Sequence, residues 1–172
     1  MPDMLVKLYD LPEATSLVNR LAEQGIVIRR AMAYEKRSVV EWVLNSFGDG
    51  WASECDVAFG QHPVSCFIAT ETREIIGFAC HDSTCRNFFG PTGVAEKRRG
   101  CGIGQALFLS CLHAMAANGY AYAIIGGVGP VAFYANTVGA VPIQGSDPGI
   151  YRDQPQEKER EQVGPPNDPQ HG

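Results

Sequence analysis

One segment, residues 97–107 (KRRGCGIGQAL), constrains the fold more than any other, because it places three glycines between a basic run and an apolar stretch of helical periodicity. Glycine lets a backbone approach another group closely. A helix that begins behind such glycines presents free N–H groups and the positive end of its dipole, an arrangement that binds phosphate. The segment therefore predicts a strand, a tight loop and a helix, and the loop either binds an anion or only allows close strand-to-helix packing.

The bulk properties favour one globular domain without nucleic-acid or membrane partners. A chain of 172 residues is within the size of a single domain. Its formal charge of −5 and the lack of a long Lys/Arg stripe argue against nucleic acid as a ligand. No apolar run has the length of a membrane span, and no signal peptide is recognisable, so we expect a cytoplasmic protein.

The cysteines predict core packing and no metal. They lie mostly in apolar runs such as VSCFIA and IIGFAC, and no pair has CxxC spacing. We interpret them as small buried hydrophobes in a reducing compartment. The histidines do not cluster with cysteines at ligand spacing, although Cys80, His81, Asp82 and Cys85 remain an alternative zinc group. The six cysteines are Cys55, Cys66, Cys80, Cys85, Cys101 and Cys111.

Apolar periodicity divides the chain into strands and helices. Strands are predicted near residues 4–11, 25–33, 63–71, 74–82, 86–96, 120–129 and 140–144. Helices are predicted near residues 12–25, 35–47, 51–59, 102–119 and 130–139. The third and fourth strands are expected to pair as an antiparallel hairpin, and Gly90, Pro91 and Gly93 predict a bulge in the fifth.

This order of elements predicts an α+β domain in which helices flank a mixed sheet. Residues 1–25 are expected to form an added strand and helix, and residues 26–151 the main domain. Residues 152–172 have no apolar periodicity, which is typical of a disordered C-terminal tail.

Two common phosphate loops do not fit the glycine segment. The dinucleotide fingerprint GxGxxG requires a glycine where Gln105 stands, and it requires an acidic residue after the next strand, where Gly126 and Gly127 stand. A Walker loop requires GK[ST] at the start of the helix, which here reads GIGQ. Dinucleotide binding stays open only if the substitution at Gln105 is tolerated.

A third loop does fit. Arg99, Gly102 and Gly104 match the pattern R/Q-x-x-G-x-G/A, and the stretch GVAEKRRGCGIGQAL resembles the most characteristic motif of the GCN5-related N-acetyltransferases. The later stretch AFYANTVGA resembles that family's second signature, a helical Phe-Tyr followed by glycine and a small residue. The resemblance covers roughly residues 26–150, and the combination is similar to a prokaryotic subgroup without an assigned substrate.

The resemblance implies a mostly antiparallel sheet in which the bulged strand splays from its neighbour. Acetyl-coenzyme A would lie in the resulting V-shaped cleft, with its pyrophosphate on the loop amides and the charge of Arg98 and Arg99 beside it. The Val94 N–H would polarise the thioester carbonyl, and Tyr134 would be the general acid toward the sulfur. The expected cofactor-binding residues are Val94, Arg99, Gly100, Cys101, Gly102, Ile103, Gly104 and Gln105. The implied reaction is direct acetylation of a primary amine on a small molecule or peptide, without a metal.

Two departures from the family pattern keep a second function open. Gly127 stands where many members have an asparagine that binds the cofactor arm, and the stretch RNFFG lacks the glutamate that serves some members as a base. The alternative is therefore a coenzyme A-binding sensor or assembly module without catalysis. Candidate bases are Glu54, Asp56, His81, Asp82 and Glu96, although a free amine can also lose its proton to water.

The acceptor is expected to bind to the first half of the chain, because the glycine loop and Tyr134 serve the cofactor. Trp42, Trp51, Glu54 and Asp56 form an aromatic and acidic set that suits a cationic amine. Ser146, in the turn-forming stretch QGSDPGIY, is a further acceptor candidate, and plain turn chemistry is its alternative role. A homodimer is also compatible with a domain of this size.

Overall fold

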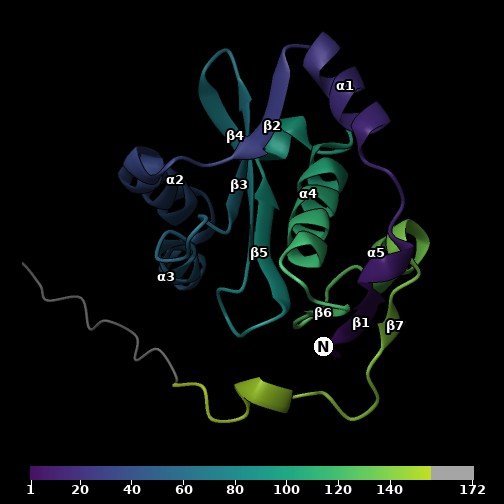
Figure 1. The fold of residues 1–172 in the computed structure, drawn as a ribbon. Helices are drawn as coiled ribbons and strands as arrows, with labels where there is room; N and C mark the ends of the chain where they lie inside the picture. The colour runs from purple at the N-terminus through teal and green to yellow at the C-terminus, as the bar shows by residue number, and fades with distance from the viewer. Residues whose placement is uncertain (156–172) are drawn as a thin grey trace, which may run out of the picture.

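The computed structural model describes residues 1–155, so most of the expected tail, residues 156–172, lies outside the described residues. Within residues 1–155, seven strands form one sheet in the order β2-β3-β4-β5-β6-β1-β7 (Figure 1). The strands are β1 (Met4–Lys7), β2 (Ile26–Arg30), β3 (Cys66–Glu71), β4 (Glu74–His81), β5 (Phe88–Val94), β6 (Tyr122–Ile125) and β7 (Val141–Pro142). The helices are α1 (Thr15–Glu23), α2 (Lys36–Phe47), α3 (Asp49–Ala58), α4 (Ile103–Ala117) and α5 (Val131–Val138).

The sheet is mixed, as expected for the α+β class. All neighbouring strands run antiparallel except β5 and β6, which are parallel. The predicted hairpin is β3 and β4, joined by a turn in which Thr72 and Arg73 have positive φ. The prediction of a mixed, mostly antiparallel sheet flanked by helices is confirmed.

Helices cover both faces of the sheet and create two cores. Figure 1 shows α2 and α3 on one side and α4 with α1 on the other. Successive side chains of a strand point to opposite faces, so Ala79 of β4 packs in the α4 core while its neighbours Phe78 and Cys80 pack in the α2–α3 core. Because both faces are covered, β4 is a nearly continuous apolar run.

The N-terminal strand is an interior strand of the sheet. β1 pairs with β6 on one side and with β7 on the other, and Met4 and Val6 are fully buried. The helix that follows, α1, packs against β2 and α4. Residues 1–25, which look like an addition in the sequence, thus share the sheet and the core of residues 26–151.

Several strand ends differ from the sequence expectation. β1 stops at Lys7 because a 3₁₀ turn, Leu8–Asp10, follows it. β7 is only Val141–Pro142 and lies at the sheet edge, where the missing N–H of Pro142 costs no ladder bond. Among the helices within residues 1–155, none is long and apolar enough to cross a membrane.

The two parallel strands separate soon after they meet. β5 and β6 pair only at Phe88 with Ile124 and at Phe89 with Ile125, where β6 ends. Beyond that point Gly90 has a φ of +125°, a conformation that favours glycine, and the β4–β5 register shifts between Ala79 and His81. β5 then continues to Val94 with no strand of the described chain on that side.

Candidate active site

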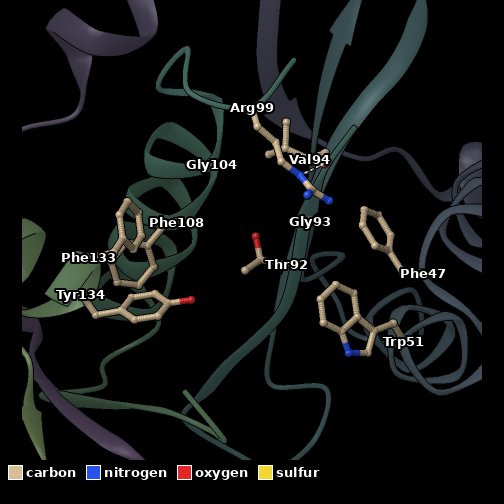
Figure 2. A pocket seen from close by; sticks show the side chains of 10 residues that line it. All are labelled: Phe47, Trp51, Thr92, Gly93, Val94, Arg99, Gly104, Phe108, Phe133 and Tyr134. Atoms are coloured by element: carbon tan, nitrogen blue, oxygen red, sulfur yellow. Dashed lines mark hydrogen bonds between the residues drawn. The ribbon is translucent and has the colours of Figure 1, made fainter. Parts of the chain in front are cut away.

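A cleft of about 340 Å³ lies where β5 has left β6, and five elements and the glycine loop contribute to its wall. In Figure 2, β5 runs through the middle of the view, with the first half of α4 and the start of α5 on one side of it and two aromatic rings from α2 and α3 on the other. The lining residues are Phe47, Trp51, Thr92, Gly93, Val94, Arg99, Gly104, Phe108, Phe133 and Tyr134. Five of the residues singled out from the sequence as site residues therefore line one cavity: Trp51, Val94, Arg99, Gly104 and Tyr134.

The exposed edge of β5 offers backbone hydrogen-bonding groups to this cleft. The Ala95 N–H donates to the Ile76 carbonyl at 2.8 Å, and Gly93 is paired with Phe78. Because backbone groups alternate in direction along a strand, the N–H groups of Thr92 and Val94 point away from β4 and into the cleft. The Val94 carbonyl points the same way, since it accepts a hydrogen bond from Arg99 Nε at 3.2 Å.

The glycine loop shapes the start of α4. Gly100 and Gly102 have φ values of +81° and +87°, so both positions favour glycine. Gly102 is the N-cap of α4, and no side chain caps the helix. The first N–H groups of a helix lack intrahelical acceptors, so those of residues 103–105 are free to bind an anion. Ile103 is buried, which anchors the first turn in the α4 core.

Three arginines lie near the loop, and they differ in what they contact. Arg99 lines the cleft, whereas Arg98 forms an ion pair with Glu71 of β3 and is thereby committed to the fold. Arg20 of α1 was not foreseen from the sequence. Its Nη2 atom lies 3.6 Å from the point that a Cβ on Gly102 would occupy. The positive charge beside the loop therefore comes from Arg99 and from the N-terminal helix.

Tyr134 combines a buried ring with a hydroxyl that faces the cleft. Its ring packs edge-on against Phe108, with centroids 5.1 Å apart, and against Phe133 at 5.0 Å. In Figure 2 the hydroxyl points from α5 toward Thr92 on β5. Burial raises the pKa of Tyr134. The phenol therefore keeps its proton at neutral pH and is a hydrogen-bond donor to whatever occupies the cleft.

Phe47 and Trp51 form the third wall. A Cβ on Gly93 would lie 2.5 Å from Phe47 Cζ, so the ring lies directly on the glycine backbone. Trp51 stacks on Phe47 with centroids 5.1 Å apart and is 39% exposed. The sequence predicts Trp51 as a site residue, whereas Phe47 is only the last residue of a predicted helix. The close approach to Gly93 is tertiary and has no local signal.

The residues expected to bind the acceptor separate in the structure. Glu54, one turn after Trp51 on α3, accepts a hydrogen bond from the Thr84 hydroxyl in the β4–β5 loop. Asp56 instead forms an exposed ion pair with Lys36 at 3.0 Å, and neither carboxylate is part of the cleft wall.

Ser146 holds a turn and does not line the cleft. Its Oγ accepts from the Asp3 N–H at 2.8 Å and donates to the Ile143 carbonyl at 2.8 Å. Tyr151, which the sequence does not mark as a site residue, lies in the same segment after β7 as Ser146. Its Oη atom is 2.6 Å from the position of a Cβ on Gly126, directly after β6. Burial and then the negative charge of Glu54 raise the pKa of Tyr151.

The candidate bases do not line the cleft either. His81 is 1% exposed, and its Nδ1 lies 2.7 Å from Asp82 Oδ2. Burial lowers the pKa of His81. Asp82 also accepts the Asn87 N–H at 2.7 Å, which fixes the β4–β5 loop. Glu96 is exposed in a 3₁₀ turn after β5. The cleft wall itself contains no carboxylate and no histidine.

Gly127, which stands where many members of the family have an asparagine, donates a backbone hydrogen bond to a buried carboxylate. Its N–H donates to Asp3 Oδ1 at 2.9 Å, and Asp3 is buried. The carboxylate of Asp3, directly before β1, therefore fixes the backbone just beyond β6. This contact ties the N-terminal strand to the end of the strand that borders the splay.

No protein-family model matches the chain. No curated protein matches it in sequence. Solved structures do match its fold. A GCN5-related glucosamine N-acetyltransferase region of a fungal multi-domain β-N-acetylglucosaminidase superposes with a TM-score of 0.67 at 16% identity, covering 83% of this chain and 19% of that one.

Two bacterial proteins superpose over nearly the same span. A GCN5-related N-acetyltransferase from Sphaerobacter thermophilus has a TM-score of 0.58 at 19% identity and 83% coverage. One from Kribbella flavida has a TM-score of 0.55 at 16% identity and 82% coverage. The chain spans only 48% and 53% of the lengths of these two structures. By these superpositions, the chain has the fold of the GCN5-related N-acetyltransferases.

Proposed function

We propose that the protein is an acetyl-coenzyme A-dependent N-acetyltransferase that transfers the acetyl group directly to a primary amine. One observation carries the proposal: the free edge of β5, the uncapped first turn of α4 and the Tyr134 hydroxyl all face one cleft. An extended amide-containing chain can pair with a free strand edge as an added strand does. The pantetheine arm of coenzyme A has that shape and those amides.

The loop suits the pyrophosphate end of the same ligand. The free N–H groups of residues 103–105 would hold the phosphates, with Arg99 and Arg20 beside them. Gly100 and Cys101 would contribute through their backbones, since the Cys101 side chain is exposed and its thiol donates to the Arg99 carbonyl. Each hydrogen bond to a charged group contributes about 1.5–3 kcal/mol.

The reaction needs a polarised carbonyl and a proton for the departing sulfur. The amine nitrogen attacks the acetyl carbon, the carbonyl oxygen gains negative charge, and the Val94 N–H that faces the cleft is placed to stabilise it. The carbon–sulfur bond then breaks, and Tyr134 donates its proton to the thiolate. The surplus proton of the amine leaves through water, since no carboxylate or histidine that could accept it lines the cleft.

The acceptor side combines rings and negative charge. Trp51 at the cleft, Glu54 one turn later and Tyr151 from the C-terminal segment suit a small molecule or peptide that presents a protonated amine. We place the protein in the cytoplasm, without nucleic-acid or membrane partners and with a homodimer as its candidate assembly.

Glu54→Gln is expected to raise the KM for a cationic amine by roughly tenfold, because a hydrogen bond to a charged partner is lost. The affinity for coenzyme A should not change. Steady-state kinetics at saturating acetyl-coenzyme A measures the effect. Asp56→Asn is the matched control, since Asp56 lies on the same helix and pairs with Lys36. Equal KM values for the two variants would remove Glu54 from the acceptor site.

Thermal unfolding with acetyl-coenzyme A, coenzyme A and NAD in separate samples tests the proposal first. A ligand at a hundred times its Kd stabilises by about 2.7 kcal/mol, which is a shift of several degrees for a domain of this size. We expect shifts with both coenzyme A species and none with NAD. A shift in Tm with NAD alone would favour dinucleotide binding. No shift with any of the three ligands would mean that the loop glycines serve only to pack the strand against the helix.

A coenzyme A-binding sensor is the second candidate, and the absence of a carboxylate from the cleft wall favours it. Tyr134 argues against it, because a sensor has no need of a proton donor in the cleft. A panel of primary amines separates the two functions. Release of free thiol that depends on the amine supports the transferase, whereas tight binding without turnover of any amine supports the sensor.

A further inference from the structure

Three cysteines from three different elements meet in the α2–α3 core, away from the cleft. The Sγ atoms of Cys55 (α3), Cys66 (β3) and Cys80 (β4) all lie within 4.8 Å of one another. All three residues are fully buried. We call this group the cysteine triad. It is separate from the proposed acetyl-transfer site.

Sheet register explains how two of the thiols come together. Cys66 and Cys80 are direct partners across β3 and β4. The neighbouring pair, Ser65 and His81, is joined by a backbone bond, since the His81 N–H donates to the Ser65 carbonyl at 2.9 Å. Bonded and non-bonded pairs alternate in an antiparallel ladder, and side chains of a non-bonded pair lie closer. Cys66 and Cys80 form such a pair, and α3 brings Cys55 onto them.

The surroundings of the triad are apolar. Val39, Val43, Phe59, Ile68 and Phe78 belong to the same buried cluster. Among the described residues, no histidine, aspartate, glutamate or further cysteine joins the group. A structural zinc site takes four protein ligands. Three sulfur atoms without a fourth ligand therefore suit an ion that is stable with three ligands.

Charge restricts the ion further. An uncompensated charge in an apolar interior is costly. Three thiolates around a monovalent or divalent ion leave a net negative charge, whereas three thiolates around a trivalent ion are neutral. The apolar environment therefore selects a trivalent ion with a preference for sulfur.

We propose that the cysteine triad binds trivalent arsenic, taken up as arsenous acid, through three sulfur ligands. Three As–S bonds replace three As–O bonds, and each hydroxide leaves as water with the proton of one thiol. No atom changes oxidation state, and no net charge is created or released. The occupied site ties α3, which carries Trp51 and Glu54, to β3 and β4.

Access requires local opening, because each thiol is shielded from solvent. Regions of a fold open and close locally at a cost below that of global unfolding. The binding rate is therefore expected to level off at high arsenite concentration, when opening of α3 becomes limiting. An exposed pair of thiols would instead give a rate that rises in proportion to arsenite.

The test uses the full, reduced chain and sodium arsenite. We expect one arsenic per chain by mass spectrometry of the native protein, with the loss of three hydrogens, and X-ray absorption showing three sulfur neighbours and no oxygen. Cys55→Ala, Cys66→Ala and Cys80→Ala should each abolish the three-sulfur site. Cys111→Ala, a buried cysteine on α4 in the other core, is the matched control and should bind as the unchanged protein does.

Comparison with cadmium makes the charge argument testable even if a variant fails to fold. Arsenite affinity should be the same at about pH 6 and about pH 8, whereas cadmium displaces protons and should gain up to about tenfold per released proton per pH unit. Arsenic on one or two sulfurs, arsenic at the exposed Cys85 or Cys101, retained binding in a folded triad variant, or no binding would each overturn the proposal.

Discussion

Replacement of Tyr134 by phenylalanine is expected to lower kcat by tenfold or more and to leave the affinity for coenzyme A nearly unchanged. General-acid assistance contributes about 10²–10⁴-fold to such a step. The substitution removes one oxygen and retains the ring that packs on Phe108 and Phe133. Steady-state kinetics together with a coenzyme A titration separates a loss of proton donation from a loss of binding.

The control for this experiment is Tyr122→Phe. Tyr122 lies at the exposed start of β6, where its ring contacts Tyr9 outside the cleft. That variant should retain the kcat of the unchanged protein. Unchanged turnover in the Tyr134 variant would contradict its role as the acid, and a parallel fall in coenzyme A affinity would indicate that the hydroxyl binds the cofactor instead.

Gly93→Ala is expected to destabilise the fold and to weaken coenzyme A binding together. The new Cβ would lie 2.5 Å from Phe47 Cζ and 2.8 Å from Cε1 and Cε2. The ring has little room to move, because Trp42, Trp51 and Phe78 surround it at centroid distances of 5.6, 5.1 and 5.7 Å. Overpacking of this kind costs about 1–3 kcal/mol, which thermal unfolding measures as a fall in Tm of several degrees.

A second substitution shows whether the clash is the cause. Phe47→Leu in the Gly93→Ala background removes the ring, so the two changes together should cost less than the sum of their separate costs. Gly50→Ala is the control glycine, since nothing lies within 4 Å of its Cβ position in α3. Additive costs for Gly93 and Phe47 would mean that the backbone at Gly93 moves and the ring does not.

The order of strands and helices could be predicted because each element has its own periodicity. The runs PVSCFIATE and EIIGFACHD predict an antiparallel hairpin, and β3 and β4 form it. The end of β7 could not be predicted from the sequence, since the apolar stretch AVPIQ is longer than the two residues that pair with β1. The length of an edge strand depends on how far its neighbouring strand extends beside it, and the local sequence of the edge strand contains no signal for that.

The candidate site divides in the same way. Gly102 and Gly104 could be placed at the start of a helix because glycines before an apolar helix are a local pattern. Asp56 and Ser146 could not be separated from Glu54 by pattern, because only the fold shows that Lys36 and Asp3 are their partners. Residue type predicted what each side chain can do, and packing decided which of them face the cleft.

By itself, the sequence determined the helix dipole at the glycine loop, the bulge at Gly90 and the phenol on α5, since each depends on residues close together in the chain. Only the tertiary structure decided that β1 enters the sheet between β6 and β7, that Phe47 lies on Gly93, and that Cys55, Cys66 and Cys80 meet. The physical reason is range. Dihedral preferences and periodicity act over a few residues, whereas burial joins side chains without regard to their separation in the chain.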